Sequence, residues 1–172
     1  MALLAVTVIG RDRPGIIAEA TGLLAGLGAN LEDSSMTLLR GHFAMVLVAS
    51  ADAATDQVEA ALAPLAAGGA LDVAVREMPV EDPPRGIGAP YLLSVHGGDR
   101  PGIVSAVTAE VAAAGGNVTD LTTRLSGDLY VVVAEVDLAA AADAGALGAR
   151  LAAVGAELGV QVSLRPVEPD LL

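Results

Sequence analysis

The stretch Gly10-Arg11-Asp12-Arg13-Pro14-Gly15-Ile16 returns later in the chain as Gly97-Gly98-Asp99-Arg100-Pro101-Gly102-Ile103. The match continues downstream at the same offset, so that Asn30 corresponds to Asn117. Self-similarity at a fixed offset is the signature of a duplicated structural unit. The chain is therefore one unit written twice, and its function is to be sought in the polar residues that both copies share.

The hydrophobic periodicity changes in a regular order within the first unit. Alternation over 4–9 predicts a strand, and helical spacing of apolar residues from 16 to 27 predicts a helix. Two strands around a hairpin signal at 40–42 follow, then a helix kinked or ended near Pro64 and a strand over 71–78. The second unit repeats this order. We therefore expect an α+β chain of two βαββαβ domains, each a four-stranded antiparallel sheet with two helices on one face, the ferredoxin-like arrangement.

The repeat also sets the domain boundaries. We place the first domain at 1–78 and the second at 91–168, joined by a Pro- and Gly-rich linker over 79–90. The strand segments 43–48 and 130–134 are apolar at both alternating positions, which predicts that the sheet face opposite the helices is covered as well. The cover would come from the sister domain or from another subunit, and we expect a homodimer.

The composition excludes several classes of function. The chain has 172 residues, no cysteine and a net charge of −12. The lack of cysteine excludes disulfides and thiolate metal sites. The acidity and the lack of a basic cluster argue against direct nucleic-acid binding, because that affinity depends on Lys and Arg contacts to phosphates. No signal-peptide flank is present, and no apolar run approaches the roughly 20 residues that span a bilayer. We therefore expect a soluble, cytoplasmic protein.

The repeated loop combines the two halves of a small-molecule site. A residue before proline is pushed out of the α region, so Arg13 should be extended, with Pro14 at the first helical position. Backbone N–H groups at 15–17 then remain uncommitted and suit a carboxylate or phosphate at the helix start. The carboxylate of Asp12 beside them suits an ammonium group, so the loop offers what a free α-amino acid requires. The second loop offers the equivalents Asp99, Arg100, Pro101 and Gly102.

Each residue of this loop also has a plainer explanation. An Asp such as Asp12 often caps a helix, an Arg such as Arg13 is often solvated or paired with an acid, and Asn30 follows a predicted helix end that it could help to form. The two histidines are isolated, and the acids near Asp33 lack a further ligand, so we expect no catalytic residue and no metal site. The recurrence of the loop, its glycine and the Asn in both units favours the functional reading.

Three features resemble the ACT domain, a small regulatory module that binds amino acids: the βαββαβ order, the D-R-P-G-I loop and the segment G-A-N-L-E-D-S over 28–34. A chain that consists of two such domains and little else is similar to the proteins of the glycine cleavage system repressor group. We expect no cofactor. The resemblance implies ligand contacts from the loop of one domain and the start of the second strand of a neighbouring one, which pairs Asp12 with Asn117 and Asp99 with Asn30 if the two domains pair by pseudo-twofold symmetry. The ligand-binding set inferred in this way is Asp12, Arg13, Pro14, Gly15, Ile16, Asn30, Asp99, Arg100, Pro101, Gly102, Ile103 and Asn117.

The chain departs from this family pattern in two places. Some ACT domains have a His two residues before the Asp of the loop, where this chain has Gly10 and Gly97. The second loop tends to be degenerate in the repressor group, whereas the segment 99–102 is intact here. Two competent sites are therefore predicted.

These observations favour a non-enzymatic, amino-acid-binding regulatory protein of amino-acid metabolism, with glycine metabolism suggested by the resemblance. It would act through a partner protein, such as a transcription factor or an enzyme, without direct contact to nucleic acid or a membrane. Two alternatives stay open: a constitutive interaction module that binds no ligand, and an acylphosphatase-like hydrolase in which Arg11, Arg13 and Asn30 cradle phosphate.

Overall fold

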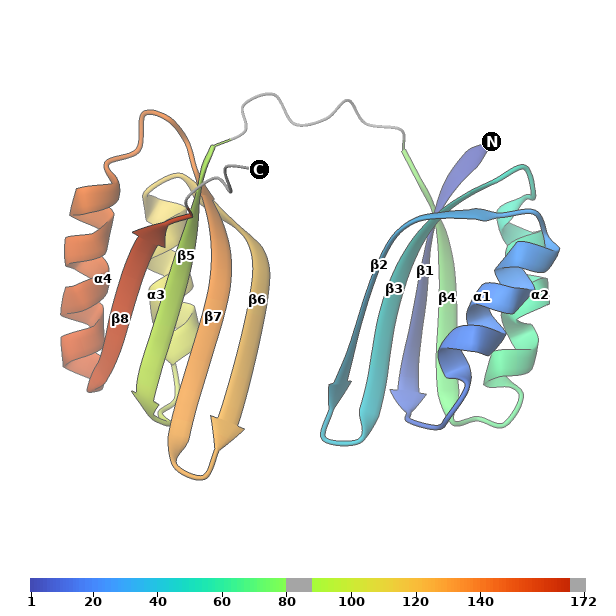
Figure 1. Cartoon of the computed structure of the whole chain (residues 1–172), viewed down its shortest axis with the longest axis horizontal. Coiled ribbons are helices and arrows are strands. Elements are labelled where there is room, and N and C mark those ends of the chain that lie inside the picture. Colours follow the sequence, from blue (N-terminus) through green and yellow to red (C-terminus); the bar gives the residue numbers. More distant parts are fainter. Residues whose placement is uncertain (80–87, 168–172) are drawn as a thin grey trace. The chain divides into compact units, whose positions relative to one another are not determined.

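The structure is a computed structural model, and it describes residues 1–79 and 88–167. The chain divides into two compact units, Met1–Asp82 and Pro83–Leu172. Each unit is a four-stranded antiparallel sheet with two helices on one face, which confirms the predicted fold (Figure 1). Most of the predicted linker over 79–90 lies outside the described residues, as does residue 168 at the end of the predicted second domain.

The first unit has the sheet order β2-β3-β1-β4. The two-residue turn between β2 and β3 consists of Arg40 and Gly41, which both have positive φ (50° and 81°), as the favoured hairpin turns require. The second helix contains Pro64 and ends two residues later. The elements are β1 (Ala2–Arg11), α1 (Ile16–Gly26), β2 (Asn30–Leu39), β3 (His42–Ala51), α2 (Thr55–Ala66) and β4 (Leu71–Met78).

The second unit repeats this topology with the sheet order β6-β7-β5-β8. Its first strand begins at Ala89, so the last two residues of the predicted linker belong to that strand. A β-bulge recurs at the same place in the two units, between Leu31 and Asp33 in one and between Val118 and Asp120 in the other. The elements are β5 (Ala89–Gly98), α3 (Ile103–Ala113), β6 (Gly116–Ser126), β7 (Leu129–Leu138), α4 (Ala144–Leu158) and β8 (Val160–Pro166).

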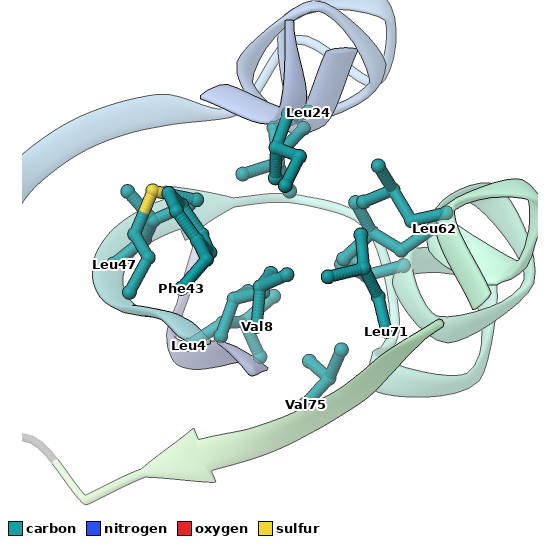
Figure 2. Close-up of a cluster of buried hydrophobic side chains, with 14 of the residues drawn as sticks. Leu4, Val8, Leu24, Phe43, Leu47, Leu62, Leu71 and Val75 are labelled. Atoms are coloured by element: carbon teal, nitrogen blue, oxygen red, sulfur yellow. The ribbon is translucent and has the colours of Figure 1, made fainter. Parts of the chain in front are cut away.

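Each unit has its own hydrophobic core between its sheet and its two helices. In the first unit, Leu24 from α1 and Leu62 from α2 point toward the sheet, where Leu62 lies beside Leu71 and the side chains of Phe43 and Leu47 of the central strand β3 fill the other side of the core (Figure 2). All five side chains are at most 3% exposed. Because α1 is anchored on the sheet by this packing, the core fixes the position of the loop that connects β1 to α1.

The opposite face of each sheet carries apolar side chains that remain exposed. Val46 of β3 is 47% exposed, and Val133 at the corresponding position of β7 is 39% exposed. Neighbouring residues of these strands, such as Met45 and Val132, point into the core and are buried. Within the described residues of each unit, nothing covers this second face. Its predicted cover by another body stays a prediction.

Candidate functional site

The loop between β1 and α1 has the same backbone conformation in both units. Gly15 has φ 89° and ψ −2°, and Gly102 has φ 91° and ψ −5°. These values match the third residue of a type II turn, for which Gly is preferred because φ is positive and for which Pro commonly comes just before. The helices begin after this turn, at Ile16 and Ile103. The prediction that Pro14 and Pro101 occupy the first helical position is therefore wrong, because each Pro belongs to the turn instead.

The start of each of these helices is uncapped. Neither α1 nor α3 receives a side-chain hydrogen bond at its N-cap, and the N–H groups at 15–17 and 102–104 have no acceptor within the described residues. The chain does use an Asp cap elsewhere, since Asp143 accepts a hydrogen bond of 2.9 Å from the N–H of Ala146 at the start of α4. Asp12 and Asp99 therefore do not act as caps, and their carboxylates are exposed beside free backbone donors.

The two arginines of the loops have different surroundings. Arg13 forms an ion pair of 2.6 Å with Glu19 one turn into α1, which agrees with its plainer interpretation as a paired residue. The position of Glu19 is occupied by Ala106 in the second unit. Arg100 has no acidic partner within the described residues, and its guanidinium lies beside Gly159 at the C-terminal end of α4. The guanidinium of Arg100 is therefore not held by an ion pair, in contrast to that of Arg13.

A depression adjoins each loop within its own unit. In the first unit it encloses about 780 Å³ of empty space that includes open solvent. Its polar end is formed by Asp12 and Arg13, and Met36 and Leu38 contribute apolar side chains. In the second unit, the corresponding depression is lined by Gly98, Asp99, Arg100, Leu125, Gly127 and Asp128. Each loop thus adjoins a hollow in the surface. The first hollow has apolar side chains from β2 in its lining, whereas charged side chains make up half of the residues that line the second.

The structure does not bring Asn30 close to the loop of its own unit. Asn30 pairs with Ser50 at one end of the β2–β3 ladder, whereas Leu39 pairs with His42 at the end where the loop lies. Asn117 has the equivalent place at the start of β6. The predicted pairing of Asp12 with Asn117 and of Asp99 with Asn30 spans the two units, and it stays a prediction.

This separation also bears on the hydrolase alternative. Arg11 ends β1 near the loop, Asn30 lies at the other end of the sheet, and Arg13 is engaged by Glu19. The three residues proposed to cradle phosphate therefore do not converge within the first unit. Across the described ranges 1–79 and 88–167, no group of three metal-binding side chains is present, and no helix there is long and apolar enough to span a membrane.

The plainer explanation for Asn30 as a helix terminator is also wrong. Gly28 ends α1 with φ 70° and donates to the carbonyl of Ala25, while the N–H of Ala29 bonds to the carbonyl of Leu24. These two bonds form the Schellman motif, and Gly is its usual residue at the positive-φ position. Asn30 takes no part in ending the helix and begins β2 instead.

Sequence reasoning missed the apolar wall of the first depression. Met36 pairs with Met45 and Leu38 pairs with Phe43, so both face the helix side of the sheet, but they are 46% and 50% exposed because α1 leaves the edge strand open. The alternation in the sequence 36–39 is too weak to show which face is buried. The register with β3 was needed to find it.

Comparison with known families identifies the repeated unit. The ACT domain matches residues 2–76 and again residues 91–145. A UPF0237 protein of Methanopyrus kandleri is 58% identical over 43 residues, which are 25% of this chain and 48% of that protein. A UPF0237 protein of Listeria monocytogenes is 39% identical over 61 residues, covering 34% of this chain and 68% of that protein. The chain spans about half the length of the first of these relatives.

Two of the similar solved structures match nearly the whole chain. An unknown protein from Galdieria sulphuraria is 30% identical with a TM-score of 0.82, and the match covers 96% of this chain and 98% of that one. A candidate glycine cleavage system transcriptional repressor is 20% identical with a TM-score of 0.68, covering 98% of both chains. At this identity the second match shows the shared fold only.

Proposed function

Because the chain belongs to the ACT-domain family, we propose that it is a non-enzymatic regulatory protein that binds a free amino acid at the loops after β1 and β5. The ligand's ammonium group contacts the carboxylate of Asp12 or Asp99. Its carboxylate accepts hydrogen bonds from the free N–H groups at the start of α1 or α3. The adjoining depression takes the side chain.

The observation that carries this proposal is the uncapped helix start beside an uncommitted Asp, present twice. The first backbone N–H groups of a helix have no acceptor within the helix, so they bond to a side chain, to water or to a ligand. A structural role for Asp12 and Asp99 would place each carboxylate on those donors, as Asp143 does in α4. Their carboxylates are instead exposed at the edges of hollows, next to donors for an anion.

We propose that the regulatory effect passes through a partner protein. The net charge of −12 disfavours a direct contact with nucleic acid, because too few cations are available to replace condensed counterions. The match to a candidate glycine cleavage system transcriptional repressor shows a shared fold, and from this likeness we propose a place in amino-acid metabolism, with glycine metabolism as the specific pathway. The same acidity fits a partner with a basic surface.

We also propose that the protein is a homodimer. The sheet face opposite the helices exposes apolar side chains in both units, including Ile9, Val46, Leu92 and Val133 at 39–48%. Soluble monomers rarely expose contiguous apolar patches of more than a few hundred Å². Sedimentation of the full chain tests this proposal: a dimer is expected, and a monomer at micromolar concentration would contradict it.

A thermal-shift screen against the free amino acids tests the binding proposal. A ligand present at 100 times its dissociation constant stabilises the folded protein by about 2.7 kcal/mol, which raises Tm by several degrees in a domain of this size. At least one amino acid is expected to raise Tm. If none does so at millimolar concentration, the constitutive interaction module becomes the better interpretation.

A further inference from the structure

The depression of the first unit exposes apolar side chains on the helix side of the sheet. Ile17, Met36 and Leu38 are 45–50% exposed around it, whereas Ile16 and Phe43 form a buried floor. These side chains come from three elements: α1, β2 and β3. The hollow therefore has an apolar floor and wall, and only one end of it is polar.

The polar end of the hollow is negatively charged, because its one basic side chain is already paired with an acid of the protein. Arg13 is held by Glu19 at 2.6 Å, so its charge is compensated within the protein. Asp12 has no such partner within the described residues and remains the negative group of this hollow. A ligand that complements this surface carries an ammonium group at one end and an apolar group at the other.

We propose that the site of the first unit selects free amino acids with an apolar side chain of about the length of leucine or methionine. This inference rests on the proposed function and adds the class of ligand. The ammonium group meets Asp12 and the ligand's carboxylate meets the backbone donors that follow Gly15. The side chain of the ligand lies against Met36 and Leu38, where it removes apolar surface from water.

The second unit has a less apolar wall, because one of the two wall positions is polar there while Leu125 keeps the apolar side chain at the position of Leu38. Thr123 stands at the position of Met36, and Asp128 of the β6–β7 turn lines the hollow. Arg100 has no counterpart of Glu19 to compensate it. The hollow beside Asp99 thus presents charges of both signs, and it does not favour an apolar side chain.

Calorimetric titration of the full chain with an amino-acid series tests the inference. The series is alanine, valine, leucine and methionine, with serine and aspartate as polar members. Each buried methylene contributes about fourfold in affinity, so leucine is expected to bind tens of times more tightly than alanine, at one site per chain. Equal affinity for leucine, serine and alanine would overturn the proposed selectivity.

Matched variants locate the effect. Met36→Thr introduces the residue that the second unit has at this position, and Leu38→Thr removes the other wall. Both positions are half exposed in a strand, where Thr is well tolerated, so the fold is retained and circular dichroism checks this. Each variant is expected to lower leucine affinity about fivefold to tenfold while alanine affinity changes less than twofold. Leu39→Thr, one residue further along β2 at the same 50% exposure and outside the lining of the hollow, is the control and leaves leucine affinity unchanged, while Leu125→Thr reports on the hollow of the second unit.

The outcomes separate this inference from the function on which it rests. If amino acids bind and Met36→Thr leaves the preference for leucine intact, the apolar wall does not select the ligand and the inference is wrong, while the proposed function stands. If no amino acid in the series binds but another amino acid raises Tm in the thermal-shift screen, the inference is wrong and the proposed function stands; if the screen is negative as well, both fail. If Leu125→Thr abolishes the preference for leucine and Met36→Thr does not, the selective site belongs to the second unit and the inference is overturned.

Discussion

Replacing one glycine of the second loop tests whether its backbone conformation shapes the site. Gly102 has φ 91°, and a Cβ added there would meet nothing within 4 Å, so Gly102→Ala changes conformational energy without creating a clash. A left-handed residue with a side chain costs about 1–2 kcal/mol, partly offset by the reduced entropy of the unfolded chain. We expect a net destabilisation of about 1 kcal/mol.

The matched control is Gly148→Ala in α4 of the same unit. Gly148 has ordinary helical geometry, and its added Cβ also meets nothing within 4 Å. Alanine in a helix interior is more stable than glycine by about 0.5–1 kcal/mol, so the same chemical change is expected to stabilise here. The two variants should therefore move stability in opposite directions.

Tyrosine fluorescence during urea unfolding reads the second unit alone. The chain has no tryptophan, and both of its tyrosines, Tyr91 and Tyr130, lie in this unit. With a slope of about 1 kcal/mol per molar urea, Gly102→Ala lowers the midpoint by about 1 M and Gly148→Ala raises it by about 0.5–1 M. Gly102→Asn should fall between wild type and Gly102→Ala, because Asn tolerates positive φ. A midpoint for Gly102→Ala at or above wild type would refute the assigned turn.

Three further predictions concern the first unit and the surface. Gly10→Ala should destabilise by about 2–4 kcal/mol, because Gly10 has φ 153° and an added Cβ would overlap the carbonyl oxygen of Ala70; an unchanged midpoint by circular dichroism would contradict this packing. Glu19→Ala should change stability by less than about 1 kcal/mol, since its ion pair with Arg13 is exposed, and a larger loss in urea unfolding would show a structural role. The purified protein should give no salt-sensitive gel shift with DNA at submicromolar concentration, and such a shift would oppose action through a partner.

The fold was predictable because its signals are local and occur twice. Alternation in β1, helical spacing from Ile16 and the turn at Arg40 and Gly41 each reflect backbone geometry that a few neighbouring residues determine. The start of α1 was less accessible to sequence reasoning. Pro14 is compatible both with a first helical position and with a type II turn, and only the positive φ of Gly15 decides for the turn.

The loop residues of the site could be predicted from the sequence, but the apolar side chains that line the rest of the depression could not. Asp12 and Gly15 stand in a repeated motif, whereas Met36 and Leu38 belong to an edge strand whose exposure depends on how far α1 extends over the sheet. The different environments of Arg13 and Arg100 also depend on distant residues, Glu19 in one unit and Gly159 in the other. These features depend on the register between strands and on tertiary packing, and the sequence of the loop alone predicts neither of them.

The central claim is that the exposed carboxylates of the two loops bind the ammonium group of a free amino acid. Calorimetric titration of the full chain and of the double variant Asp12→Ala/Asp99→Ala, with the amino acid that raises Tm most, tests it most directly. Loss of a charge-assisted contact costs about 1.5–3 kcal/mol, so the affinity of the double variant is expected to fall by about tenfold to a hundredfold. Unchanged affinity in a double variant that retains its circular dichroism spectrum would contradict the claim.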